Sequence, residues 1–81
     1  MPPTMRSVYS SMVSRIGYDE DTGELHVQFN TGRTAIYRDV DAKTAREVMN
    51  APSIGEAVNG SVKGRFGFHY ADGQGRRTNP G

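Results

Sequence analysis

Two stretches of this chain constrain its fold most, a helix-like segment at 53–63 and a hairpin-like segment at 25–37. In the first, Ser53 precedes Glu56 by three residues, the spacing of a capping box that begins a helix. Small or apolar side chains then recur at the positions of one helix face, namely Ile54, Ala57, Val58, Ser61 and Val62. In the second, residues 24–30 alternate strictly between polar and apolar, as in a half-buried strand. This order predicts an α+β domain in which an amphipathic helix covers a small antiparallel sheet.

The turn at 30–32 leaves two registers open for the hairpin. A two-residue turn would force the β-branched Thr31 to a positive φ, which is unfavourable. A three-residue turn with Gly32 in the left-handed bulge position makes no such demand, so we favour it. In this register Phe29 pairs with Arg33, the core face carries Leu25, Val27, Ala35 and Tyr37, and the solvent face carries His26, Gln28, Thr34, Ile36 and Arg38.

Three further segments complete the expected architecture. Residues 13–18 form the first strand, and Asp41 is the N-cap of a helix of about ten residues that ends before Pro52. Residues 66–70 alternate again and indicate either a short fourth strand or an aromatic flap. We therefore expect a three-stranded antiparallel meander with two short helices on one face.

Length and composition predict one small domain. The chain has 81 residues and 35% hydrophobic content, which suit a single domain at 10–70 with a flexible N-terminus at 1–9 and a flexible, disordered tail at 71–81. It contains no cysteine, so disulfides cannot stabilise its small core and self-association is the remaining common means. The absence of a long apolar run favours a cytoplasmic protein that does not engage membranes.

The positions of several short motifs resemble one known family. These motifs are Ser10-Ser11, Ile16-Gly17-Tyr18-Asp19, Val27-Gln28-Phe29, Gly32, Val40, Ala51-Pro52-Ser53-Ile54-Gly55, Asn59, Val62 and Phe66, and their order resembles the KTSC family. That family comprises small bacterial and phage proteins and an appendage at the C-terminus of some lysyl-tRNA synthetases. The resemblance implies RNA binding, although the family's function is not established.

The chain departs from the family pattern at three positions where an aromatic side chain is usual. Ala35, Ala45 and Ala57 occupy these positions, and the predicted faces direct all three inward. Emptying one buried aromatic site costs about 3–5 kcal/mol, so three empty sites would exceed the stability of a small domain. The space is therefore filled by a second subunit, by a ligand, or from within by Phe66, Phe68 and Tyr70.

The sequence lacks the combinations of residues that catalysis or metal binding would need. His26 and His69 have neither metal-type spacing nor an evident carboxylate partner, and no nucleophile-elbow motif surrounds Ser10 or Ser11. The acidic turn at 19–24 lacks the ligand spacing of a calcium loop. We expect no enzyme activity, no metal and no cofactor.

Cations and aromatic residues alternate near the C-terminal end of the expected domain. Such a segment suits nucleic-acid bases stacked on rings, with phosphates held by the cations. The expected ligand-binding residues are Tyr37, Lys63, Arg65, Phe66, Phe68, His69 and Tyr70. The predicted function is non-catalytic binding of single-stranded RNA or a small nucleotide, the latter in an oligomeric phage protein that sequesters a nucleotide immune signal.

An alternative function is a protein-interaction module of a phage or bacterium. In this reading the outer sheet face or a free sheet edge binds a host protein. Its support is the expected exposure of Ile36 beside His26 and Arg38.

Overall fold

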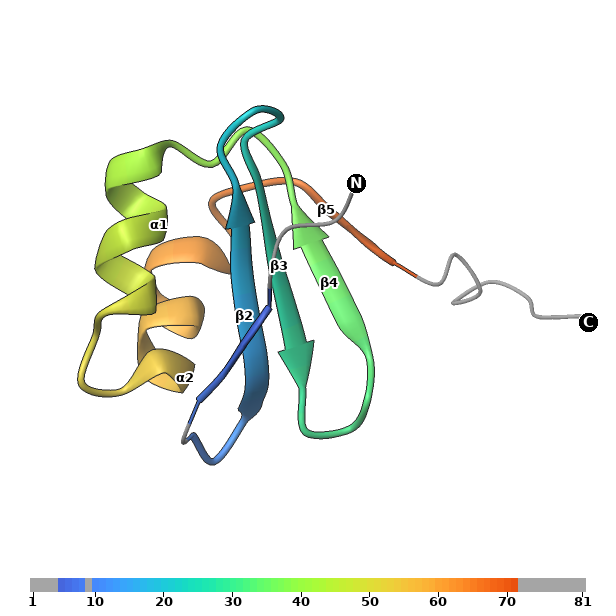
Figure 1. Cartoon of the computed structure of the whole chain (residues 1–81), viewed down its shortest axis with the longest axis vertical. Helices are drawn as coiled ribbons and strands as arrows, with labels where there is room; N and C mark the ends of the chain where they lie inside the picture. The colour runs from blue at the N-terminus through green and yellow to red at the C-terminus, as the bar shows by residue number, and fades with distance from the viewer. Residues whose placement is uncertain (1–4, 9, 72–81) are drawn as a thin grey trace, which may run out of the picture.

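The structure, a computed structural model, describes residues 5–8 and 10–71. They form one antiparallel sheet in which the strands follow chain order, with the helices on one side of it (Figure 1). The strands are β1 (Arg6–Ser7), β2 (Val13–Asp19), β3 (Glu24–Phe29), β4 (Thr34–Tyr37) and β5 (Phe68–Tyr70). The helices are α1 (Ala42–Met49), α2 (Ile54–Ala57) and the π-helix η1 (Val58–Val62). The expected α+β class, with an antiparallel sheet and two short helices, is confirmed.

The sheet has five strands where three were expected. For residues 66–70, β5 confirms the short fourth strand rather than the alternative of an aromatic flap. β1 lies in the N-terminal segment that was expected to be flexible, and it pairs Arg6 with Ile16 of β2. The Arg6 guanidinium also donates a hydrogen bond to the carbonyl oxygen of Met49 at 2.6 Å, which ties β1 to the end of α1. Most of the expected tail, residues 72–81, lies outside the described residues.

The bulged hairpin register is confirmed. Leu25 pairs with Tyr37 and Val27 with Ala35, as the three-residue turn requires. The Phe29 amide donates to the Arg33 carbonyl oxygen at 2.8 Å, and Gly32 has a φ of 96°. Glycine adopts this left-handed conformation without strain, so Gly32 fixes which side chains of β4 face the helices.

A β-bulge explains why β2 shows no clean alternation in the sequence. Its register against β3 shifts between Val13 and Arg15. The extra residue lets both Val13 and Ile16 point into the core, where neither is exposed.

The N-cap prediction is confirmed for α1, whereas the capping box of α2 is wrong. The Asp41 carboxylate accepts hydrogen bonds from the Thr44 amide at 3.0 Å and the Thr44 hydroxyl at 2.8 Å. These bonds lower the pKa of Asp41. The Ser53 side chain makes no capping hydrogen bond, and only its carbonyl oxygen joins the helix by accepting from the Ala57 amide.

The second helix widens into a π-helical turn before it ends. In η1 the Lys63 amide donates to the Val58 carbonyl oxygen at 2.8 Å, five residues back. Gly64 then takes a φ of 82° and turns the chain out of the helix. The wider turn keeps Val58 and Val62 in the core and ends with Lys63.

The core lies between the helices and the inner face of the sheet. Its buried members are Val13, Ile16, Leu25, Val27, Ala35, Tyr37, Val40, Ala45, Val48, Ile54, Val58 and Val62. The expected exposure of Ile36 on the opposite face is wrong, since only 9% of this residue is exposed. The pairing of β5 with β4 places His69 beside Ile36, and His26 flanks it from β3.

In the described part of the chain, no helix is long and apolar enough to cross a membrane.

Candidate binding pocket

A pocket of about 420 Å³ opens on the inner face of the sheet, at its β4–β5 side. Aromatic rings and two cationic side chains surround it, and none of the described residues around it is acidic. Its lining comprises Ser11, Met12, Phe29, Asn30, Thr31, Arg33, Ala35, Tyr37, Lys63, Phe68 and Tyr70. The volume lies within the range of small-molecule sites in proteins.

Strand pairing brings the aromatic residues of this pocket together. Tyr37 pairs with Phe68 and Ala35 with Tyr70, so all four side chains project from the same face of the sheet. The Phe68 ring lies 5.4 Å from the Tyr37 ring and 5.5 Å from the Tyr70 ring, centroid to centroid. These three rings form one continuous aromatic surface.

The rings differ in their access to solvent. Phe68 is 45% exposed, which is unusual for a large apolar side chain, whereas Tyr37 is buried. Burial, and secondarily the nearby Tyr70, raises the pKa of the Tyr37 hydroxyl above its usual value. Tyr37 is therefore neutral at physiological pH, and Phe68 offers an open apolar ring to a ligand.

Two cations supply the charge of the pocket. The Arg33 guanidinium lies over the Tyr70 ring, 4.2 Å from its centroid. Lys63 reaches the pocket from the end of η1. Because no acidic side chain of the described residues offsets them in the lining, the pocket favours an anionic ligand.

The three alanine positions have different surroundings. Ala45 is buried in the core and Ala57 packs against it, together with Phe66 and Tyr70. Ala35 is buried as well, but it also forms part of the pocket lining. A small side chain at this position leaves open space beside the aromatic surface.

Four of the seven expected binding residues line the pocket: Tyr37, Lys63, Phe68 and Tyr70. The other three lie elsewhere. The Arg65 guanidinium lies 5.9 Å from the centroid of the Phe66 ring, and Phe66 packs against the core. His69 pairs with Ile36 on the opposite face of the sheet, because alternate residues of a strand face opposite sides.

Two of the largest lining residues, Phe29 and Arg33, were not among the expected binding residues. The confirmed hairpin register already paired them on the inner face, so the signal was present. The turn residues Asn30 and Thr31 and the pre-strand residues Ser11 and Met12 complete the rim. No local pattern marked these four.

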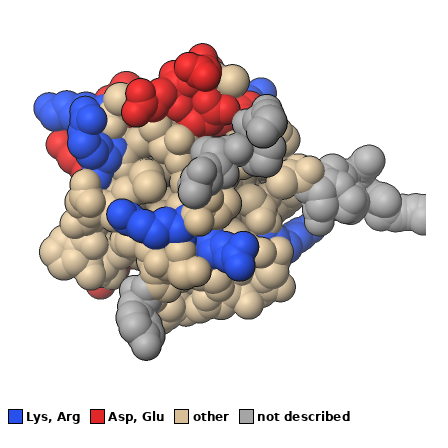
Figure 2. Space-filling view, viewed as in Figure 1, with Lys and Arg blue, Asp and Glu red and all other residues tan. Residues whose placement is uncertain are grey.

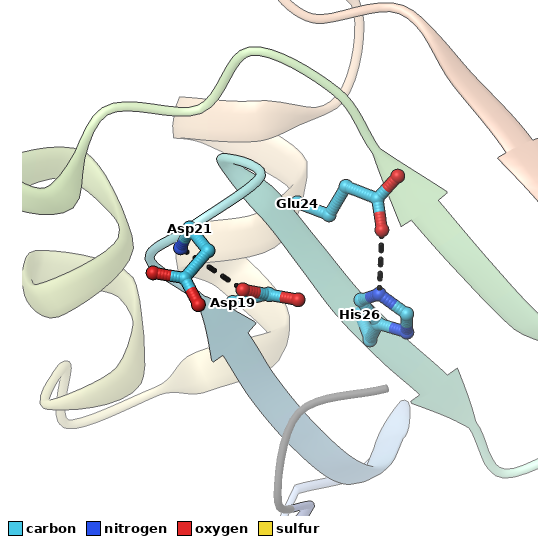
Figure 3. A network of polar contacts seen from close by, with 4 residues as sticks. All are labelled: Asp19, Asp21, Glu24 and His26. Carbon is cyan, nitrogen blue, oxygen red and sulfur yellow. Dashed lines mark hydrogen bonds and ion pairs between the residues drawn. The ribbon is translucent and has the colours of Figure 1, made fainter. Parts of the chain in front are cut away.

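Acidic side chains gather at another part of the molecule. Figure 2 shows them together at the end where the β2–β3 turn lies, with Lys and Arg side chains across the middle of the same view. At that turn the Asp21 amide donates to the Asp19 carboxylate at 3.0 Å, and Glu24 lies 3.2 Å from the ring of the buried His26 (Figure 3). Among the residues described, no group of three His, Cys, Asp or Glu side chains is placed to hold a metal ion.

Comparisons with known proteins agree on one family. Residues 9–66 match the family described as KTSC domain. A protein of Tsukamurella paurometabola is 37% identical over 62 residues, which cover 76% of this chain and 92% of that protein. The crystal structure of a KTSC domain protein from Yersinia pestis superposes with a TM-score of 0.80 at 32% identity, covering 84% of this chain and 96% of that one.

A further relative is similar to this chain over only a small part of its own length. A lysine tRNA ligase of Nostoc punctiforme is 31% identical over 58 residues, which cover 72% of this chain and 10% of the ligase. The similarity is thus confined to a tenth of that enzyme. Together, the match over 9–66 and the shared fold show that this chain belongs to the KTSC domain family.

Proposed function

We propose that this KTSC domain is a non-catalytic binding module for a ligand that carries both a phosphate and a flat base. Single-stranded RNA and small nucleotides are the ligands of this kind. The observation that carries the proposal is the open ring of Phe68 in one pocket with Lys63 and Arg33. Bases of any sequence stack on exposed aromatic rings, and cations hold the phosphate beside them.

Two features of the relatives and of the pocket support this ligand class. A segment similar to this chain occurs within a lysine tRNA ligase, a protein that by its name acts on RNA. For a small nucleotide in the cytoplasm, the role that we propose is sequestration without chemical conversion. The pocket offers rings and cations for binding, and its described lining has no carboxylate or histidine to act as a general base.

Calorimetric titration with an oligouridylate and with the four nucleoside monophosphates tests the proposal. We expect Phe68→Ala to weaken binding by about tenfold, since base stacking on a ring contributes about 1–3 kcal/mol. Phe68 is half-exposed, so this variant should keep its circular dichroism spectrum. Lys63→Ala should weaken binding and reduce its salt dependence.

Arg65→Ala is the matched control for Lys63→Ala. It removes the same charge two residues further along the chain, but its guanidinium lies near Phe66, outside the pocket. The proposal predicts unchanged binding for this variant. An equal loss for Arg65→Ala and Lys63→Ala, or no binding of either ligand class by the wild type, would contradict it.

A further inference from the structure

Resting on the proposed function, we propose that Arg33 gates the pocket and selects phosphorylated ligands. In the free domain its guanidinium covers the ring of Tyr70. On binding, the base of the ligand enters the corner between this ring and the perpendicular Phe68 ring, where it contacts both rings. The displaced guanidinium then contacts the phosphate.

The structure shows the covered state. The guanidinium carbon of Arg33 lies 4.2 Å from the centroid of Tyr70, close enough for a cation–π contact. It therefore occupies the ring face that a stacked base would need. Ala35, which pairs with Tyr70 across the strands and also lines the pocket, contributes only a methyl group there.

Little else holds the Arg33 side chain in place. Arg33 is exposed and follows the turn at Gly32. Its backbone carbonyl is fixed by the Phe29 amide, but within the described part of the chain no acidic group pairs with its guanidinium. The long side chain can thus leave Tyr70 while the backbone stays in register.

The exchange favours ligands that carry a phosphate. Stacking of a base on an aromatic ring is stronger than an exposed cation–π contact, so the base can replace the guanidinium. A nucleoside that displaces Arg33 offers the guanidinium no new partner, so the free energy of the cation–π contact is lost. A nucleotide regains that loss, because a guanidinium binds a phosphate through two parallel hydrogen bonds.

Substitution of Arg33 therefore has opposite effects on the two kinds of ligand. NMR titrations would measure the affinities of adenosine, uridine and their 5′-monophosphates for the wild type and Arg33→Ala. We expect the variant to bind the nucleosides about threefold more tightly, since the cation–π contact no longer competes. It should bind the monophosphates about fivefold more weakly, since one charge-assisted phosphate contact is lost.

Arg15→Ala is the matched control, because Arg15 is exposed on the opposite face of the sheet. It should leave all four affinities unchanged. If Arg33→Ala shifts nucleosides and monophosphates in the same direction, or leaves both unchanged, the gate is overturned while the binding function stands. If the wild type binds none of the four ligands, the gate is overturned; if it binds no oligouridylate either, the proposed function fails as well.

A second readout follows the Arg33 side chain itself. Protons that lie over an aromatic ring are shielded by its ring current. In the free protein we expect the Arg33 side-chain protons at unusually low chemical shifts, and saturation with uridine 5′-monophosphate should return them to ordinary values. Shielding that persists at saturation would overturn the exchange.

Discussion

Three alanines show that the space beside a small side chain can be filled or open, depending on the residues around it. The resemblance to the family implies an aromatic side chain at the positions of Ala35, Ala45 and Ala57. Ala45 lies in a closed core, whereas Ala35 lies in the floor of the pocket. The sequence alone left open whether such space is refilled or occupied by a ligand, because that depends on long-range packing.

Enlarging two of these alanines should therefore give different results. Ala35→Phe can extend its ring into the pocket, so we expect a stable protein that no longer binds a nucleotide. Ala45→Phe has no such space, and overpacking should lower the free energy of unfolding by about 1–3 kcal/mol. Urea denaturation and nucleotide titration of both variants measure the difference. Equal destabilisation by the two changes, or normal binding by Ala35→Phe, would contradict this account of the pocket.

At the scale of secondary-structure elements, the sequence predicted those features that residues close together in the chain determine. Gly32 decided the hairpin register, and Asp41 marked the beginning of α1. The π-helical η1 was not predictable, because the apolar spacing from Ile54 to Val62 suits an α-helix as well. β1 has only two residues, too few for any periodic pattern.

Two glycines of the second helical segment should respond oppositely to alanine. A β-carbon on Gly55 would lie 2.9 Å from the Ser10 hydroxyl oxygen, which accepts hydrogen bonds from the amides of Met12 and Val13. We expect Gly55→Ala to disturb these bonds and lower the free energy of unfolding by about 1–2 kcal/mol. A β-carbon on Gly60 meets nothing within 4 Å, so Gly60→Ala should raise that free energy by about 0.5–1 kcal/mol. Thermal and urea denaturation would measure both changes, and a stabilising Gly55→Ala would refute the close contact.

At the scale of the whole molecule, the pocket draws on distant parts of the chain. The sequence predicts most of the site in one basic and aromatic segment, and the pocket includes Lys63, Phe68 and Tyr70 from it. The other aromatic side chains of this segment lie elsewhere. His69 is on the opposite face of the sheet, because alternate strand residues face opposite sides, and Phe66 packs against the core. The remaining lining comes from β3, β4, the turn between them and the residues before β2, which lie far from that segment in the sequence.

The distribution of charge agrees with this position of the site. Acidic side chains gather at the end of the molecule where the β2–β3 turn lies (Figure 2). By contrast, the charged side chains in the described lining of the pocket, Arg33 and Lys63, are both cationic. An anionic ligand is therefore repelled from that end and attracted to the pocket.

Mapping a nucleotide titration on the full chain by ¹⁵N NMR tests the central claim most directly. With uridine 5′-monophosphate, the account predicts that the largest amide shifts occur around the pocket, at Arg33, Lys63, Phe68 and Tyr70. The amides around the β2–β3 turn, such as Asp21, should stay unchanged. A spectrum that does not respond at millimolar ligand, or shifts centred on that turn, would contradict it.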